Sequence, residues 1–315
     1  MKTTLIVSTL LAALLAMGAP LTSQAADVVT PALLVTSAAA EKFNIGPMKV
    51  ERHGATGRPM ILIPGLSSGP YVWADTVRKF SAEHVIYVVT LPGFDGHPKT
   101  SGDLVAGADK WIGELIASRQ LVKPILVGHS MGAALSIAYA GKHPEQVGGL
   151  VAIDGLPVFP GAERMTPEQR VAMASATKMR MAGMTQEVFA GQQKAYMRSA
   201  MGVMDEATAD AVAARSAHSD AGAVLDYMAQ VLAMDVRGTL PAIPFPVLVI
   251  APYHEGDAKA AGMQMTAEGK AAYYKSLMAG TAKLTVLPVA PARHFAMLDQ
   301  PQQVADAIRA YLKTL

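Results

Sequence analysis

The stretch PILVGHSMGAALSIAYA, residues 124–140, decides the fold. It begins with the apolar residues 124–127, which are typical of a buried strand, and ends with residues 133–140, which suit a helix. Gly128-His129-Ser130-Met131-Gly132 lies between them and forms a G-x-S-x-G motif at the turn from strand to helix. The glycines are needed because the turn leaves no space for side chains beside the serine. The turn lifts the Ser130 hydroxyl clear of the sheet, and a nearby histidine must take its proton before it can act as a nucleophile.

The same alternation of strand and helix extends outward from this motif over most of the chain. Helical periodicity is clear at residues 109–121 and 302–312. Short apolar runs bounded by Gly or Pro predict five further buried strands, at residues 60–63, 85–89, 150–153, 246–250 and 284–287. Strands that alternate with helices predict an α/β fold with a mainly parallel sheet.

One segment, residues 166–237, interrupts this alternation because it contains no convincing strand. Thr166-Pro167-Glu168 is a helix-start signal, so we expect a helical cap inserted over the carboxyl edge of the sheet. The segment and its flanks are rich in methionine, which either fills gaps between small helices or lines a pocket for an apolar acyl or alkyl group. Ten of the 19 methionines lie here: Met165, Met173, Met179, Met181, Met184, Met197, Met201, Met204, Met228 and Met234.

The N-terminus has the pattern of a cleaved secretory signal. Lys2 precedes an apolar core at residues 5–17, and the small residues Ser23 and Ala25 follow. The core is shorter than the roughly 20 residues that span a bilayer. We therefore expect a periplasmic or secreted protein without a stable membrane anchor. The predicted organisation is a signal peptide at residues 1–25, a core in two parts at 26–157 and 241–315, and a helical cap at 158–240.

Composition excludes several classes of protein. Hydrophobic residues make up 51% of the 315 residues and charged residues 17%, which excludes a disordered chain. The 27 basic and 25 acidic residues give no surplus of charge for nucleic acid. The absence of cysteine excludes a thiol nucleophile and a zinc–thiolate site. Neither a His-Glu-x-x-His motif nor a glycine-rich phosphate loop occurs, so we expect no metal and no other cofactor.

The G-x-S-x-G motif in this setting resembles the α/β-hydrolase superfamily, and the resemblance extends from about Met48 to Leu315. It implies a mainly parallel sheet with helices on both faces and a catalytic order of nucleophile, acid and histidine. The family histidine follows the last strand and precedes the last helix. Ala292-Arg293-His294-Phe295 stands at that place, so the resemblance assigns this role to His294.

The resemblance leaves three candidates for the acid, a carboxylate that fixes the histidine tautomer and stabilises the imidazolium. The family usually carries the acid just after the strand that follows the cap. Counted from Ile250, Glu255 falls at the usual offset and is the preferred candidate, and Asp257 lies two residues later. A second arrangement places the acid after the strand that precedes the cap, where Asp154 stands.

The resemblance also implies an oxyanion hole made of two backbone N–H groups. Met131, which follows the nucleophile, supplies one of them. The loop Pro64-Gly65-Leu66-Ser67-Ser68-Gly69 supplies the other, from Leu66. The family usually has a histidine where Pro64 stands, which keeps the backbone donor but changes how the loop is braced.

These residues predict an exported serine hydrolase that cleaves an ester-like bond of a small or medium apolar substrate through an acyl-enzyme on Ser130. Thioesters, lactones, amides and carbon–carbon bonds are cleaved by the same machinery, and the fold does not choose among them. The competing class is a ligand-binding protein that keeps the fold without turnover.

Overall fold

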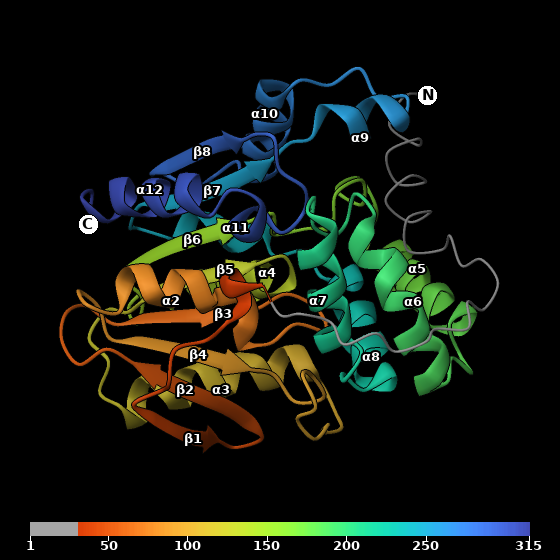
Figure 1. Ribbon diagram of the computed structural model, residues 1–315. Helices are drawn as coiled ribbons and strands as arrows, with labels where there is room; N and C mark the ends of the chain where they lie inside the picture. The colour runs from red at the N-terminus through yellow and green to blue at the C-terminus, as the bar shows by residue number, and fades with distance from the viewer. Residues whose placement is uncertain (1–30) are drawn as a thin grey trace.

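The computed structural model describes residues 31–315, and the expected signal peptide lies outside them. An eight-stranded sheet forms the centre, in the order β1-β2-β4-β3-β5-β6-β7-β8 (Figure 1). Six strands, from β3 to β8, run parallel, while β1 and β2 form an antiparallel edge. The strands are β1 (Glu41–Ile45), β2 (Met48–His53), β3 (Met60–Ile63), β4 (Ile86–Thr90), β5 (Ile125–His129), β6 (Gly149–Ile153), β7 (Val247–Pro252) and β8 (Leu284–Val289).

The mainly parallel α/β sheet predicted from the sequence is confirmed, and each of the six predicted strands is present. The edge hairpin β1–β2 was not predicted. Its strands alternate polar and apolar residues, and one face of β1 is exposed, so neither strand shows the apolar run that identifies a strand covered on both faces.

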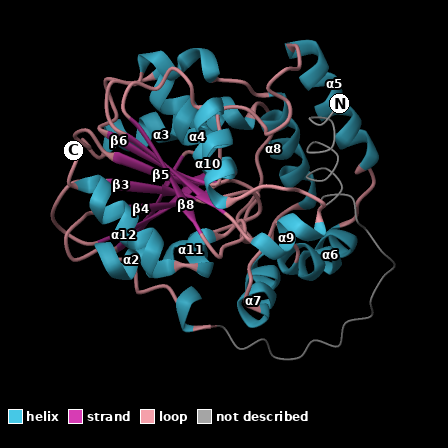
Figure 2. Cartoon of the chain, turned by 90° about the horizontal axis from the view of Figure 1, so that it is seen from above, coloured by secondary structure: helices cyan, strands magenta, loops and turns pink. Residues whose placement is uncertain are grey.

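Helices cover both faces of the sheet, as Figure 2 shows. Successive residues of a strand point to opposite faces, so Met60 and Leu62 of β3 pack toward α2 and α12, while Ile61 and Ile63 pack toward α3, α4 and α10. Burial of each such side chain contributes roughly 1.5–3 kcal/mol. These helices are α2 (Ala74–Phe80), α3 (Leu104–Ser118), α4 (Met131–Lys142), α10 (Ala267–Leu277), α11 (Ala296–Asp299) and α12 (Pro301–Leu312), and a short α9 (Glu255–Ala260) follows β7.

Four helices lie between β6 and β7 and gather beyond the ends at which the strand arrows point (Figure 1). They are α5 (Pro167–Arg180), α6 (Gln186–Arg198), α7 (Glu206–Ser216) and α8 (Ala221–Ala233). Thr166 caps α5 in a capping box with Gln169, as the helix-start signal predicts. We call residues 158–240, within which all four helices fall, the helical insertion.

The remaining regular elements are short 3₁₀ helices: η1 (Ala32–Leu34), η2 (Pro70–Trp73) and η3 (Arg237–Ala242). Among residues 31–315, no helix is both long enough and apolar enough to cross a bilayer.

Candidate active site

Ser130 occupies the tight turn between β5 and α4. Its φ of 53° and ψ of −121° are strained for a residue with a side chain. The Ser130 N–H donates to Ile153 O at 2.8 Å, which ties the turn to β6. A Cβ on Gly128 would lie 2.4 Å from Gly132 O, and one on Gly132 would lie 2.2 Å from Ile63 O. Both motif glycines are therefore required by packing, as the sequence predicts.

Asp154 lies at the carboxyl end of β6, the strand beside β5. Its φ is 47°, and its N–H donates to Ile250 O at 3.0 Å. The next residue, Gly155, packs so closely that a Cβ would come within 2.2 Å of Ser130 O. The turns after β5 and β6 are thus packed against each other, which brings the Asp154 carboxylate to the same edge of the sheet as the Ser130 hydroxyl.

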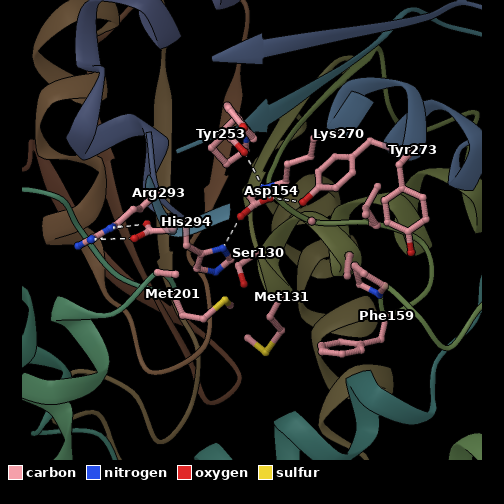
Figure 3. Close-up of a pocket in the computed structure, with 18 of the residues that line it drawn as sticks. Ser130, Met131, Asp154, Phe159, Met201, Tyr253, Lys270, Tyr273, Arg293 and His294 are labelled. Atoms are coloured by element: carbon pink, nitrogen blue, oxygen red, sulfur yellow. Dashed lines mark hydrogen bonds and ion pairs between the residues drawn. The ribbon is translucent and has the colours of Figure 1, made fainter. Parts of the chain in front are cut away.

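His294 lies in the loop between β8 and α11 and reaches back over this edge. Its Nδ1 is 2.6 Å from Asp154 Oδ2, and both side chains are almost fully buried. Figure 3 shows Ser130 beside the imidazole of His294 and Asp154 bonded to the ring. The three side chains form the arrangement in which a carboxylate orients a histidine next to a hydroxyl nucleophile.

Asp154 is held from its other oxygen by two residues of α10. The Tyr274 hydroxyl donates to Oδ1, and Lys270 Nζ lies 3.6 Å from the same oxygen. Burial raises the pKa of the Asp154 carboxyl, but the Lys270 charge and the hydrogen bonds from His294 and Tyr274 outweigh it, so the pKa lies well below its usual range. Asp154 is therefore ionised. Burial, with the Asp154 charge, raises the pKa of Tyr274 well above its ordinary value, so this hydroxyl remains a donor.

The prediction that Glu255 is the acid beside His294 is wrong. Glu255 is the first residue of α9, its side chain is 67% exposed, and it pairs with Lys259 at 2.6 Å. Asp257 is also engaged elsewhere, because it holds Arg293 through two hydrogen bonds of 2.7 and 3.1 Å. The structure instead places Asp154 against His294. The offset from the end of β7 gave the wrong residue because α9 begins at Glu255 and directs this side chain into solvent.

The two proposed oxyanion donors both lie next to Ser130. Met131 is the first residue of α4, so its N–H has no partner within the helix. Leu66 lines the same cavity as Ser130, and a Cβ on its neighbour Gly65 would lie 3.0 Å from Ser130 Cβ. The structure thus brings together Ser130, His294, Leu66 and Met131 as expected.

The Leu66 loop is braced without the histidine that Pro64 replaces. Ser67 has a φ of 52°, and its carbonyl accepts a hydrogen bond from Ser219 Oγ at 3.2 Å. Ser219 is fully buried in the turn between α7 and α8, and its Oγ also accepts from Asp95 N at 3.1 Å. The helical insertion therefore supports the loop that carries a predicted oxyanion donor. Ser219 was not identified from the sequence, because the contact joins residues 152 positions apart.

A cavity of about 320 Å³ opens at Ser130. Its walls are mostly apolar and come from the sheet edge, the helical insertion and the segment from α9 to α10. Only part of the methionine-rich segment contributes: Met201, Met228 and Met234 line the cavity, whereas Met197 is buried in the core and Met179 is exposed. Two more lining residues, Met263 and Met265, follow α9 and were missed because no pattern connects them to the site.

His129, the variable residue of the motif, lies beneath the site. Its Nε2 is 3.0 Å from His294 O, and its ring packs 4.6 Å from the centre of the His294 ring. Burial lowers the pKa of His129 to about 3, with a contribution from nearby His294, so the ring is neutral and supports the loop of His294 by a hydrogen bond.

Comparison with known proteins agrees with this geometry. The family model described as the alpha/beta hydrolase family matches residues 60–307. The chain belongs to this family. This alpha/beta hydrolase is similar to 2-succinyl-6-hydroxy-2,4-cyclohexadiene-1-carboxylate synthase of Escherichia coli O1:K1 / APEC. The two proteins are 24% identical over 220 residues, a stretch that covers 69% of this chain and 86% of the synthase.

Another relative matches a shorter stretch. Abhydrolase domain-containing protein abhd-5.2 of Caenorhabditis elegans is 30% identical over 125 residues, or 38% of this chain and 27% of that protein. The chain therefore matches less than a third of this relative's length. Among solved structures, an esterase from Exiguobacterium antarcticum superimposes with a TM-score of 0.65 at 18% identity, covering 84% of this chain and 95% of the other. At this identity the likeness shows the fold alone.

Proposed function

We propose that this alpha/beta hydrolase is a serine hydrolase that cleaves an ester-like bond of a small or medium apolar substrate through an acyl-enzyme on Ser130. The observation that carries the proposal is the hydrogen bond of 2.6 Å between His294 Nδ1 and the buried Asp154, with Ser130 beside the same imidazole and an apolar cavity in front of it.

The reaction follows from the placement of these groups. Ser130 Oγ attacks the substrate carbonyl carbon while the other imidazole nitrogen, Nε2 of His294, takes the hydroxyl proton. Asp154 accepts the Nδ1–H bond and stabilises the imidazolium that forms. The N–H groups of Leu66 and Met131 bind the negative oxygen of the tetrahedral intermediate. The imidazolium then gives its proton to the leaving group, and a water molecule, activated by the same histidine, releases the acid and restores Ser130.

The apolar cavity favours an acyl or alkyl group over a charged one. Leu156, Val158 and Phe159, which follow β6, line it together with Met201, Met228 and Met234. A site lined in this way gains affinity from buried apolar area, at about 25 cal/mol per Å². Its volume of about 320 Å³ is at the small end of the range for ligand pockets.

A fluorophosphonate probe tests the nucleophile. We expect the probe to label the wild-type protein and to leave Ser130→Ala unlabelled. A series of p-nitrophenyl esters from acetate to decanoate, with a thioester, a lactone and an anilide of matched chain length, then determines the bond type. A wild-type protein that neither reacts with the probe nor hydrolyses any of these compounds would be a binding protein of this fold, and the proposal would be wrong.

The acid is tested by a matched pair of amides. Asp154→Asn removes the charge that orients His294, and we expect kcat to fall by about 10⁴-fold. Glu255→Gln makes the same chemical change at the exposed position and is expected to leave kcat within about twofold of wild type, because surface ion pairs contribute little.

We also propose that the protein is exported after cleavage near Ala26, on the basis of Lys2, the apolar residues 5–17 and the small residues Ser23 and Ala25. Expression of the full chain in a Gram-negative host tests this. The expected product is a periplasmic or extracellular protein whose intact mass lacks the first 25 residues, and a cytoplasmic protein that keeps them would contradict it.

A further inference from the structure

We propose that Lys270 and Tyr274 are positioning residues that hold Asp154, and through it His294, in the orientation and ionised state that the reaction needs. This inference rests on the proposed function, because it assigns Asp154 the role of the triad acid. The two residues lie four positions apart on α10, so they project from the same face of the helix.

The first argument is geometric. Asp154 has two oxygens with different partners: Oδ2 accepts from His294, and Oδ1 accepts from the Tyr274 hydroxyl. A carboxylate fixed at both oxygens cannot rotate away from the imidazole. Asp154 also has a positive φ. A strained backbone conformation of this kind persists only where surrounding contacts hold it, and the two hydrogen bonds are such contacts.

The second argument is electrostatic. Asp154 is buried, and burial alone would favour its neutral form. Lys270 Nζ lies 3.6 Å from Oδ1 and supplies a positive charge that keeps the carboxylate ionised. Lys270 is itself fixed, because its Nζ donates to Pro252 O at 2.5 Å, at the end of β7. The lysine thus links the strand ends of β6 and β7.

The remaining titratable groups around Asp154 do not replace this charge. His294, from the loop after β8, is the catalytic base that the carboxylate orients, so it is not an independent source of positive charge. His129, from β5, is neutral because burial lowers its pKa to about 3. Tyr274 donates a hydrogen bond but carries no charge. Among the described residues, Lys270 is therefore the lysine or arginine whose side chain forms an ion pair with Asp154.

The same contacts explain how Asp154, which directly follows β6, can serve as the acid. At that position the carboxylate lies over the edge of the sheet, where α10 packs against β7 and β8 and reaches it from the side opposite His294. Glu255 and Asp257, on α9, have no comparable contacts with His294 in the described part of the chain.

The test compares Lys270→Met, Lys270→Arg and Tyr274→Phe with wild type in the full protein, using p-nitrophenyl butyrate. Removal of the lysine charge lets the Asp154–His294 pair take up a proton more easily, so we expect the acidic limb of the kcat/KM profile to move upward by about one pH unit in Lys270→Met. Lys270→Arg keeps the charge and should restore the wild-type limb.

Tyr274→Phe removes the hydroxyl that fixes Oδ1 but leaves the charge. We expect kcat to fall about 10- to 100-fold with KM changed less than about twofold, because a hydrogen bond to a charged carboxylate is lost and the loss acts on the transition state. The rate of fluorophosphonate labelling of Ser130 should fall by the same factor, which measures the nucleophile without product release.

Two controls separate positioning from a general loss of stability. Lys275→Met makes the same change on an exposed position of α10 and should keep the wild-type profile. Tyr139→Phe removes a hydroxyl bonded to Gln146, away from the catalytic residues, and should lower the melting temperature without changing kcat.

The outcomes are distinct. An active wild type whose profile and kcat are unchanged in Lys270→Met and Tyr274→Phe overturns this inference and leaves the proposed function intact. A Lys270→Met variant in which only KM rises overturns it too, because the lysine would then contact substrate. A wild type without labelling or hydrolysis overturns the proposed function and this inference together.

Discussion

Ser219→Ala is the change that most directly tests whether the helical insertion supports catalysis. Ser219 Oγ is buried and joins two backbone groups of the core: it donates to Ser67 O at 3.2 Å and accepts from Asp95 N at 3.1 Å. The substitution leaves both groups without this partner. At about 1–3 kcal/mol for each buried polar group, less some relaxation, we expect a loss of about 2–4 kcal/mol in the free energy of unfolding. A domain of ordinary stability, about 5–15 kcal/mol, remains folded after such a loss.

The expected effect on activity comes from Leu66, the neighbouring residue that we propose as an oxyanion donor. Ser67 has a φ of 52°, a conformation that costs roughly 1–2 kcal/mol and that the contact with Ser219 helps to maintain. When this contact is lost, Ser67 can relax and move the N–H of Leu66. Complete loss of one oxyanion donor lowers kcat about 10²- to 10³-fold, so displacement of the donor should lower kcat by about 10- to 100-fold.

The assay measures kcat and KM with p-nitrophenyl butyrate and the free energy of unfolding in guanidinium chloride. Ser216→Ala is the matched control: this serine ends α7 just before the turn, is equally buried and bonds to the Tyr71 hydroxyl at 3.1 Å. The control should lose about 1 kcal/mol of stability and keep kcat within about twofold. If Ser219→Ala loses stability but keeps kcat, or if both variants lose kcat equally, the reasoning is refuted.

Three other predictions follow from the site. Because the pKa of His129 is about 3 in the folded protein and about 6.5 in an unfolded chain, unfolding takes up a proton between these values. The contribution of neutral His129 to the free energy of unfolding should therefore be fully present above pH 6.5 and fall by up to about 1.4 kcal/mol per pH unit toward pH 3. Urea midpoints from pH 4 to 8 that show no such slope would contradict this. Met228→Ala should lower the free energy of unfolding by about 2–4 kcal/mol and shift the preferred p-nitrophenyl ester to a longer chain, because Met228 is buried and lines the cavity. An unchanged chain-length profile would show that Met228 does not contact the acyl group. Gly132→Ala should abolish soluble expression or activity, since a Cβ would lie 2.2 Å from Ile63 O; a variant with wild-type stability and kcat would show that the turn can adjust.

The parts of this protein that the sequence predicts are those determined by local patterns. The turn at Ser130 is recognisable because two glycines and the flanking strand and helix lie within a few residues of it. The parallel strands are recognisable because burial on both faces leaves continuous apolar runs. The placement of His294 follows from chain order, which the fold fixes.

The acid could not be chosen in this way, because the choice depends on which carboxylate reaches His294 in space. Asp154 and Glu255 both follow strands of the sheet, and only the direction of the chain after each strand separates them. After β6 a positive φ turns Asp154 inward, whereas after β7 the start of α9 turns Glu255 outward. The support from Lys270 and Tyr274 was also missed, because no helix was predicted at α10, where a spacing of four residues places the two side chains on one face.

The contacts of the α7–α8 turn with the core have a consequence for engineering. Besides Ser219, the turn is held by Arg215, which binds Asp95 through hydrogen bonds of 3.0 and 2.8 Å, and by Asp220, whose N–H donates to Gly93 O at 2.7 Å. A chimera that replaces residues 158–240 with the equivalent segment of another family member would exchange much of the substrate cavity. It would also remove the support of the Leu66 loop, so such a graft should transfer substrate preference only when the donor segment keeps a hydroxyl at position 219 and a cation opposite Asp95.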